Sequence, residues 1–227
     1  SYAKVDYSNF MNITACTALK LIPDPLKSHP VFLCIDDTMV SKFGKKFENV
    51  SKLFDHAAHN GSNYLNGHCF VSIMLCVPVL DHDKISYLSV PLGYGYRMWQ
   101  KKESKLELAA SMIRQVMPEF LSKEHVIILC DSWYTKKNLV SIIDEYPNLD
   151  LIGNARIDSV MYDLAPERTG RRGRPAKHGK RLCVETDFTF SKEKIGDYYT
   201  GVRRVLTKIF GNREVLAYVT EDRKSVV

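Results

Sequence analysis

Two short apolar runs, each ending in acidic residues, stand out in the pattern of hydrophobic and polar positions. Residues 31–35 lead into Asp36 and Asp37, and residues 126–130 lead into Asp131. Apolar runs of this length with β-branched members are typical of strands buried on both faces, so each predicts a core strand that delivers carboxylates where it leaves the core. If the two strands are neighbours ending at the same sheet edge, these carboxylates lie close together.

The rest of the first two thirds alternates between strand and helix. Two apolar stretches flank the turn-rich residues 81–84 (Asp-His-Asp-Lys) and predict an antiparallel hairpin. Apolar residues from Leu106 to Met117 recur with the spacing of an amphipathic helix, which Pro118 helps to end. The predicted order is strand, hairpin, helix, strand, helix and strand, over residues 31–38, 69–91, 103–120, 126–131, 135–145 and 149–154.

These elements predict an α/β fold with a mixed sheet flanked by helices. Residues 1–30 carry a weak helical pattern and a proline-rich connector, and form a lead-in to the core at residues 31–155. The pattern then changes to short strand-like pieces around a basic, glycine-rich run, which predicts a β-rich insertion over residues 156–213. We expect residues 214–227 to return to the core sheet as a strand.

Length and composition predict a globular protein. A chain of 227 residues, 45% of them hydrophobic, can bury one sizeable core. No run of eighteen apolar residues and no signal-peptide pattern is present, so we expect a cytoplasmic protein that does not enter a membrane. The six cysteines form no C-x-x-C pair, which favours reduced thiols and disfavours zinc.

The positive charge is concentrated in one segment. Residues 167–181 hold seven basic residues and one acidic residue, whereas the rest of the chain holds 25 of each. One fifteen-residue segment therefore carries the whole net charge of +6. This predicts a localised contact with a polyanion.

Gathered carboxylates predict a cation. They repel one another unless a positive charge lies between them, and hard oxygen ligands suit Mg²⁺ or Mn²⁺. Successive side chains of a strand point to opposite faces, so Asp36 and Asp37 cannot both face the same site in a regular strand. Two structural alternatives remain open: Asp37 as a turn or capping residue after its strand, and Asp131 as the N-cap of the helix that follows.

Several segments in order along the chain resemble bacterial insertion-sequence transposases of the DDE type. They are Ile35-Asp36-Asp37-Thr38 with Lys42 and Gly44, Pro91-Leu92-Gly93 with Tyr96-Arg97-Met98-Trp99, Cys130-Asp131-Ser132-Trp133-Tyr134, Arg172-Gly173-Arg174-Pro175, and the late apolar residues 215–220. The resemblance implies a ribonuclease H-like fold that holds Asp37 and Asp131 as catalytic acids and metal ligands. It further implies two Mg²⁺ or Mn²⁺ ions about 4 Å apart, with Asp37 as a ligand of both ions and Asp131 as a ligand of one.

The resemblance also implies the partner and the reaction. The partner is double-stranded DNA, both the transposon ends and the target. A bacterial protein bound to this DNA is associated with the nucleoid, and two copies of the protein can form a homodimer in the DNA complex. The family's third acid, a glutamate on a later helix, has no counterpart before Val227 and is expected beyond it. The alternative is a catalytically inactive DNA-binding remnant of a transposase.

Candidate DNA contacts lie in two places. Arg171, Arg172 and Arg174 resemble the short Arg-Gly-Arg-Pro hook that enters A·T minor grooves, and Lys177 continues the basic run. A loop that only solvates its charge is the alternative. The phosphate contacts expected near the acids are Lys45, Lys46 and Arg97. Two rival enzyme classes lack their motifs: Thr38 stands where an aspartyl phosphatase needs a second Asp, and no P-loop run occurs.

Overall fold

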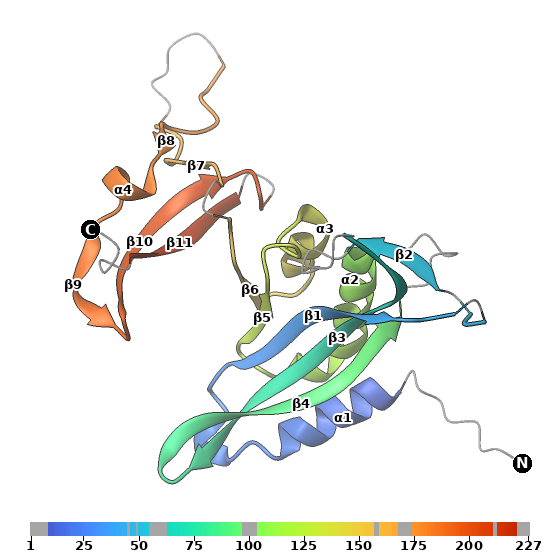
Figure 1. Ribbon diagram of the computed structural model, residues 1–227. Coiled ribbons are helices and arrows are strands. Elements are labelled where there is room, and N and C mark those ends of the chain that lie inside the picture. Colours follow the sequence, from blue (N-terminus) through green and yellow to red (C-terminus); the bar gives the residue numbers. More distant parts are fainter. Residues whose placement is uncertain are drawn as a thin grey trace, which may run out of the picture. The chain divides into compact units, whose positions relative to one another are not determined.

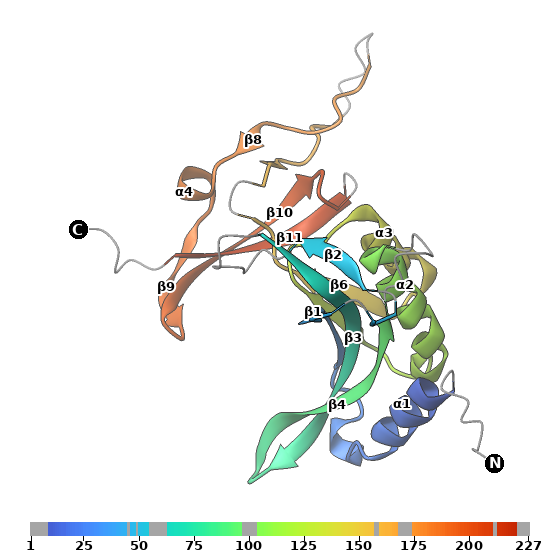
Figure 2. The same cartoon turned by 45° about the vertical axis from the view of Figure 1, so that its right-hand side comes forward.

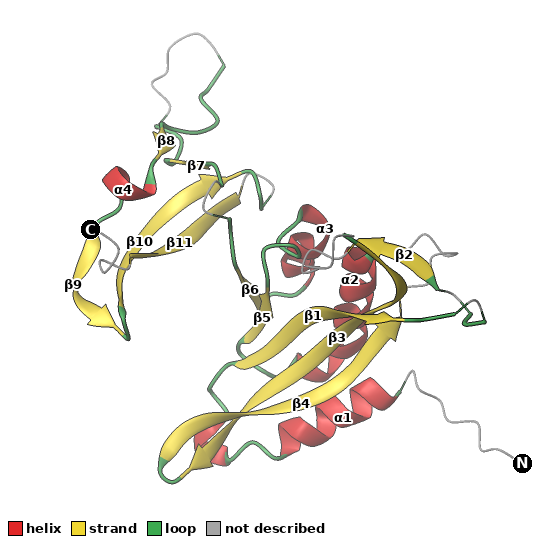
Figure 3. Ribbon diagram, viewed as in Figure 1, coloured by secondary structure: helices red, strands yellow, loops and turns green. Residues whose placement is uncertain are grey.

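The computed structural model describes residues 9–44, 46–48, 50–54, 63–96, 104–156, 159–167, 174–210 and 213–221. The chain divides into two compact units, unit 1 at residues 1–154 and unit 2 at residues 155–227. Unit 1 contains a six-stranded sheet with helices, and unit 2 contains a five-stranded sheet (Figures 1 and 3). Within the described ranges, no helix has the length and apolar character needed to cross a membrane.

The sheet of unit 1 is mixed. The middle strand β1 is antiparallel to β3 on one side and parallel to β5 on the other; β2 and β4 pair with β3, and β6 is parallel to β5. This mixed sheet with its helices confirms the predicted fold class. The strands are β1 (Val31–Ser41), β2 (Ser51–Phe54), β3 (Tyr64–Asp81), β4 (Lys84–Tyr96), β5 (Val126–Cys130) and β6 (Leu149–Gly153).

The predicted hairpin is present between β3 and β4. Its two central residues, His82 and Asp83, both have positive φ, at 46° and 62°. Two-residue hairpin turns of the type I′ class require this conformation, because its twist matches that of the strands. β3 is longer than predicted and also pairs with β2, a strand that the sequence pattern did not indicate.

The described helices of unit 1 pack with the sheet into one core. Figure 2 shows α1 and α2 on the same side of the sheet, and Asn12 of α1 donates a hydrogen bond to the Gln115 carbonyl of α2. Val31, Leu33 and Ile35 of β1 are buried in this core. The helices are α1 (Phe10–Lys20), α2 (Lys105–Val116) and α3 (Lys137–Val140), with 3₁₀ turns at Asp24–Leu26, Met117–Phe120 and Ser141–Glu145.

The expectation that β1 is buried on both faces is wrong. Burial alternates along the strand: Leu33 and Ile35 are buried, whereas Phe32 and Cys34 are only half-buried and Asp36 is exposed. The neighbouring strand β3 behaves in the same way, with Ile73 buried and Met74 38% exposed. The helices pack on one face, so apolar side chains on the other face are not enclosed to the same extent.

Unit 2 is built around β10. The long strand β11 pairs with it from Tyr199↔Glu221 to Thr207↔Arg213, and β7 and β9 pair with it as well. The expected return of residues 214–227 to the core sheet is therefore wrong for β11, which belongs to the second sheet. The elements are β7 (Met161–Tyr162), β8 (Arg181–Leu182), α4 (Val184–Asp187), β9 (Phe190–Ile195), β10 (Tyr198–Thr207) and β11 (Arg213–Glu221).

Candidate active site

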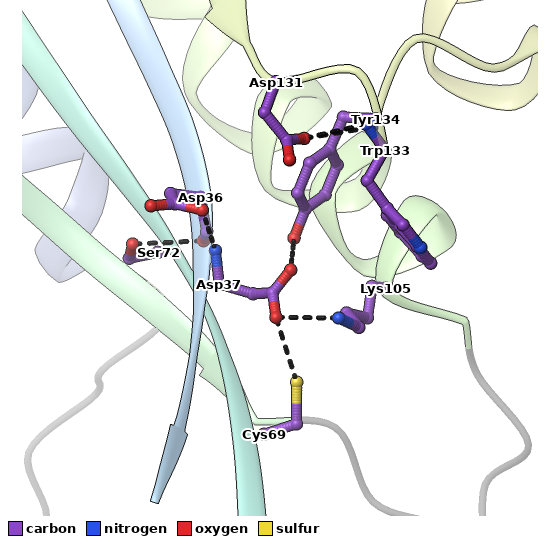
Figure 4. A network of polar contacts seen from close by, with 8 residues as sticks. All are labelled: Asp36, Asp37, Cys69, Ser72, Lys105, Asp131, Trp133 and Tyr134. Carbon is purple, nitrogen blue, oxygen red and sulfur yellow. Dashed lines mark hydrogen bonds and ion pairs between the residues drawn. The ribbon is translucent and has the colours of Figure 1, made fainter. Parts of the chain in front are cut away.

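The parallel pairing of β1 with β5 brings the two predicted acids to one edge of the sheet. The register runs from Val31↔Val126 to Ile35↔Cys130. Asp131 is therefore the first residue after the last pair on β5, and Asp37 is the second residue after it on β1. Neighbouring strands are about 4.8 Å apart. Figure 4 shows both carboxylates beside the side chain of Tyr134. The predicted meeting of two strand tips is thus present in the structure.

Tyr134 contacts both acids. Its hydroxyl donates a hydrogen bond to Asp37 Oδ1 at 2.9 Å, and its backbone N–H lies 3.3 Å from Asp131 Oδ1. The side chain is 1% exposed. Burial, followed by the charge of Asp37, raises the pKa of the Tyr134 phenol far above its usual range, so the phenol stays protonated as a donor.

Asp36 lies on the other face of β1. Its Oδ1 accepts the backbone N–H of Asp37 at 2.8 Å, and its carbonyl accepts the Ser72 hydroxyl at 3.2 Å. Figure 4 shows its side chain across the strand from the Asp37 carboxylate. The alternation of a regular strand therefore separates the two adjacent acids, and only Asp37 faces Tyr134.

Lys105 pairs with Asp37. Its ammonium lies 2.7 Å from Asp37 Oδ2, and both side chains are only 13% exposed. Lys105 is the first residue of α2, whose start is fixed by a capping box: the Ser104 hydroxyl accepts the Glu107 N–H, and the Glu107 carboxylate accepts the Ser104 N–H. A cation in the first turn opposes the helix dipole, so the ion pair with Asp37 offsets an unfavourable position.

Trp133 carries two lysines beside the acids. The ammonium of Lys105 lies 4.6 Å from the centroid of the Trp133 ring, and that of Lys136 lies 4.1 Å from it. Both distances are within the range of cation–π attraction. The ring is half-buried. Together with the two lysine ammonium groups over it, the ring forms a partly exposed, positively charged surface next to Asp37.

Asp131 also shapes the turn after β5. Its Oδ1 accepts the backbone N–H of Trp133 at 3.0 Å as well as that of Tyr134. It is not the N-cap of α3, which begins at Lys137 after Lys136. The turn packs closely against β6, because a Cβ added at Gly153 would lie 2.3 Å from Thr135 Cγ2. The Asp131 carboxylate is thus held by its own turn, with Oδ2 accepting no hydrogen bond within the described part of the chain.

The residues at this edge fit a divalent cation. Magnesium is commonly held by one or two carboxylates together with waters and substrate phosphates, and the Lys105 ammonium shows that Asp37 already attracts a positive charge. Burial, followed by the Asp131 charge, raises the pKa of the Cys130 thiol to about 12, so this neighbour stays neutral and adds no charged ligand. No group of three or more His, Cys, Asp or Glu side chains placed to hold a metal ion occurs among the described residues.

The predicted DNA contacts are only partly described. Arg174 and Lys177 are exposed residues of unit 2, and Lys46 is exposed in the segment after β1. Four further predicted contacts lie outside the described residues: Lys45, Arg97, Arg171 and Arg172.

Sequence reasoning missed the partners of Asp37. Tyr134 lies within the Asp131-Ser132-Trp133-Tyr134 segment, but its sequence position gives no sign of a bond to a residue 97 positions away. Lys105 could have been noticed through the Ser-x-x-Glu pattern of residues 104–107, which places it in the first turn of a helix.

The mixed sheet and its two strand-edge acids are consistent with the class of ribonuclease H-like nucleases. The comparison with protein families agrees, because the model of the DDE superfamily endonuclease family matches residues 12–204. The chain belongs to this family.

One solved structure is similar over most of the chain. It is the cryo-EM structure of the piggyBac transposase synaptic complex with hairpin DNA, at 14% sequence identity and a TM-score of 0.36. The match covers 86% of this chain and 34% of that chain, so this chain spans about a third of that transposase's length. None of the curated proteins compared with the chain matches it.

Proposed function

We propose that this chain forms the catalytic core of a DNA transposase of the insertion-sequence type, which cuts transposon-end DNA and joins it to target DNA. The observation that carries the proposal is the meeting of Asp37 and Asp131 at one sheet edge, with Tyr134 bonded to both. Membership of the DDE superfamily endonuclease family supports phosphodiester chemistry at this edge.

Asp37 and Asp131 are the residues that would hold Mg²⁺ or Mn²⁺. Bound ions would activate the attacking oxygen and stabilise the leaving oxygen of the phosphodiester. Tyr134 orients Asp37 by its hydroxyl and Asp131 by its backbone N–H, so that one residue fixes both carboxylates. Since the buried phenol keeps its proton, this orientation does not change over the neutral pH range.

Lys105 has two successive roles in this proposal. It neutralises Asp37 in the cation-free protein, and a bound cation would displace it from this carboxylate. The displaced ammonium would remain near the Trp133 ring, over which Lys136 also lies. There the two lysines can pair with DNA phosphates, and the Trp133 ring can lie against a sugar or a base.

The basic residues of unit 2 supply further DNA contacts in this proposal. Arg171, Arg172, Arg174 and Lys177 lie within the segment that holds the whole net charge of the chain. Such a segment binds the DNA backbone electrostatically, and its affinity falls with rising salt.

The second candidate is a DNA-binding remnant without catalysis. One observation favours it: Lys105 and Tyr134 together occupy both carboxylate oxygens of Asp37. If this arrangement persists in the presence of Mg²⁺ or Mn²⁺, the protein binds DNA but does not cut it.

Nicking of supercoiled plasmid DNA in the presence of Mn²⁺ tests the proposal. We expect Asp37→Asn and Asp131→Asn each to lower the rate more than about 100-fold, because each removes a metal ligand. Asp36→Asn is the matched control, since Asp36 lies on the other face of β1, and it should retain the rate within a few-fold. The full-length protein is used, because the third acid is expected beyond Val227. Unchanged nicking by its Asp37 and Asp131 variants would refute the site, and DNA binding without nicking by the unmodified full-length protein would favour the remnant.

A further inference from the structure

Unit 2 contains a pocket that the proposed active site does not use. It has a volume of about 490 Å³, within the range of pockets that hold small ligands. Tyr162 of β7 and its cross-strand partner Leu206 of β10 form part of its wall. The lining residues are Tyr162, Lys177, His178, Leu206, Thr207 and Lys208.

Backbone hydrogen bonds fix the basic segment to this pocket. The Gly179 N–H donates to the Asp163 carbonyl at 2.8 Å, and the Asp163 N–H donates to the Lys180 carbonyl at 2.9 Å. A Cβ at Gly179 would lie 2.7 Å from the Leu164 carbonyl oxygen, so the two chain segments approach too closely for another residue. These bonds hold Gly179 and Lys180 against Asp163, directly beside the pocket residues Tyr162 and His178.

Two stacked rings form one wall. The Tyr162 and His178 rings have centroids 3.9 Å apart and an interplanar angle of 29°. The Lys208 ammonium lies 5.7 Å from the Tyr162 centroid. The Thr207 hydroxyl is already used, because it donates to the Val160 carbonyl at 3.3 Å. The pocket thus offers a flat aromatic surface and ammonium groups as its free binding features.

The two lysines of the pocket have no acidic partner within the described part of unit 2. Other cations of the unit do: Lys180 pairs with Asp187 at 2.5 Å, Arg203 with Asp163 at 2.9 Å, and Arg204 with Glu214 at 2.9 Å. Among the residues that the structure describes, no carboxylate lines the pocket. Lys177 and Lys208 are therefore left to attract an anion from outside the chain.

We propose that this pocket binds the phosphate and sugar of one nucleotide of a DNA strand. Lys177 and Lys208 contact the phosphate, and the Tyr162–His178 pair is the surface against which the sugar or its base lies. Lys177 of the pocket follows Arg174 by three residues, so the pocket shares residues with the basic segment 167–181. The assignment of the nucleotide to DNA rests on the proposed function, whereas the presence of a cationic, aromatic pocket is independent of it.

Fluorescence anisotropy with a short DNA duplex and with its single strand, at several salt concentrations, tests the pocket in the whole chain. Lys177→Gln with Lys208→Gln should weaken binding about tenfold and lower the slope of log K against log salt by about 1 to 2. The control removes the same charge from exposed positions of β9, Lys192→Gln with Lys194→Gln, and should leave the slope unchanged. An equal loss in both double variants, or none in either, would overturn the proposal.

A second measurement separates the pocket from general charge. The imidazole NMR signals of His178 should shift on addition of the dinucleotide pdTdT, and the shift should saturate and disappear in the Lys177, Lys208 double variant. A shift with pdTdT but not with inorganic phosphate supports contact with the sugar or base; no shift with pdTdT overturns the proposal. Mn²⁺ binding at Asp37 should be the same in all these variants, so failure of the pocket and failure of the active site are distinguishable.

Discussion

Three side chains surround the Asp37 carboxylate. Lys105 lies 2.7 Å from Oδ2, the Tyr134 hydroxyl lies 2.9 Å from Oδ1, and Cys69 Sγ lies 3.7 Å from Oδ2. Only Lys105 carries a charge that opposes a metal cation. Because the ion pair is largely shielded from water, its attraction is stronger than that of a surface pair. We therefore expect Lys105 to set how readily Asp37 accepts a divalent ion.

Replacing Lys105 by Met should have opposite effects on the free and the metal-bound protein. Without Mn²⁺, we expect unfolding to require about 1–3 kcal/mol less, because a shielded carboxylate loses its partner. With Mn²⁺, the affinity should rise about tenfold or more, because the competing charge is gone. Thermal unfolding with and without Mn²⁺ measures both effects.

Lys136→Met is the matched control. Lys136 also lies over the Trp133 ring, but no ion pair joins it to an acid among the described residues. We expect little change in Mn²⁺ affinity. An equal rise in affinity in both variants would show that Lys105 acts only as one more positive charge near the site.

At the scale of elements, the start of α2 decides where Lys105 lies. The Ser104–Glu107 capping box starts the helix at Lys105 and so places the ammonium against Asp37 in the sheet. The contact joins residues 68 positions apart. A local sequence signal thus positions a long-range partner of the site.

Ser104→Ala should lower the free energy of unfolding by about 1 kcal/mol. Without the cap, the first turn of α2 that holds Lys105 should open more often. This should appear as faster hydrogen exchange at the Glu107 amide. Ser104→Thr keeps a hydroxyl that can cap the helix and should preserve both properties. Equal exchange rates in the unmodified chain and in Ser104→Ala would contradict this role of the cap.

The effect of Ser104→Ala should also depend on pH. Hydrogen bonds from the Ser104 backbone and then its side chain lower the pKa of Glu107 below its usual value. A carboxyl with a lowered pKa in the folded state stabilises the protein above its unfolded pKa of about 4.3, and this contribution is lost as pH falls through the lowered value. The difference between Ser104→Ala and the unmodified chain should therefore shrink in acid.

The elements that sequence predicts best are those with a strong local pattern. The hairpin at residues 81–84 and the two apolar runs ending in acids are present as expected. Strand alternation also predicted that Asp36 and Asp37 face opposite sides. By contrast, the bonds of Lys105 and Tyr134 to Asp37 join distant segments, and periodicity carries no information on such pairs.

Burial was harder to predict, because it depends on what packs against each element. In α1 the large residues Phe10 and Ile13 are 57% and 63% exposed, whereas Ala15 and Ala18 are buried. The small residues allow the helix to lie close to the sheet, so close packing rather than side-chain size selects the buried face. The expectation that β1 is enclosed on both faces was wrong because the described helices pack on one face of the sheet, which the sequence of β1 does not reveal.

At the scale of the whole molecule, acidic residues of the candidate site lie in unit 1 and the basic segment lies in unit 2. Unit 1 presents Asp37 and Asp131 at one sheet edge, and unit 2 holds the segment with the chain's net charge of +6. The strand β11 belongs to unit 2 because its register with β10 is continuous over nine residue pairs. In the proposed function, unit 1 therefore binds the cation and unit 2 makes much of the DNA contact.

If Asp37 and Asp131 share one cation site, as we propose, iron-directed cleavage of the protein tests this most directly. Fe²⁺ bound in place of Mg²⁺, with ascorbate and peroxide, cuts the backbone next to the metal. We predict two cuts, near residues 37 and 131, both lost in Asp37→Asn or Asp131→Asn and both retained in Asp36→Asn. A cut at one strand alone, or cuts that persist in the Asp37 and Asp131 variants, would contradict the account.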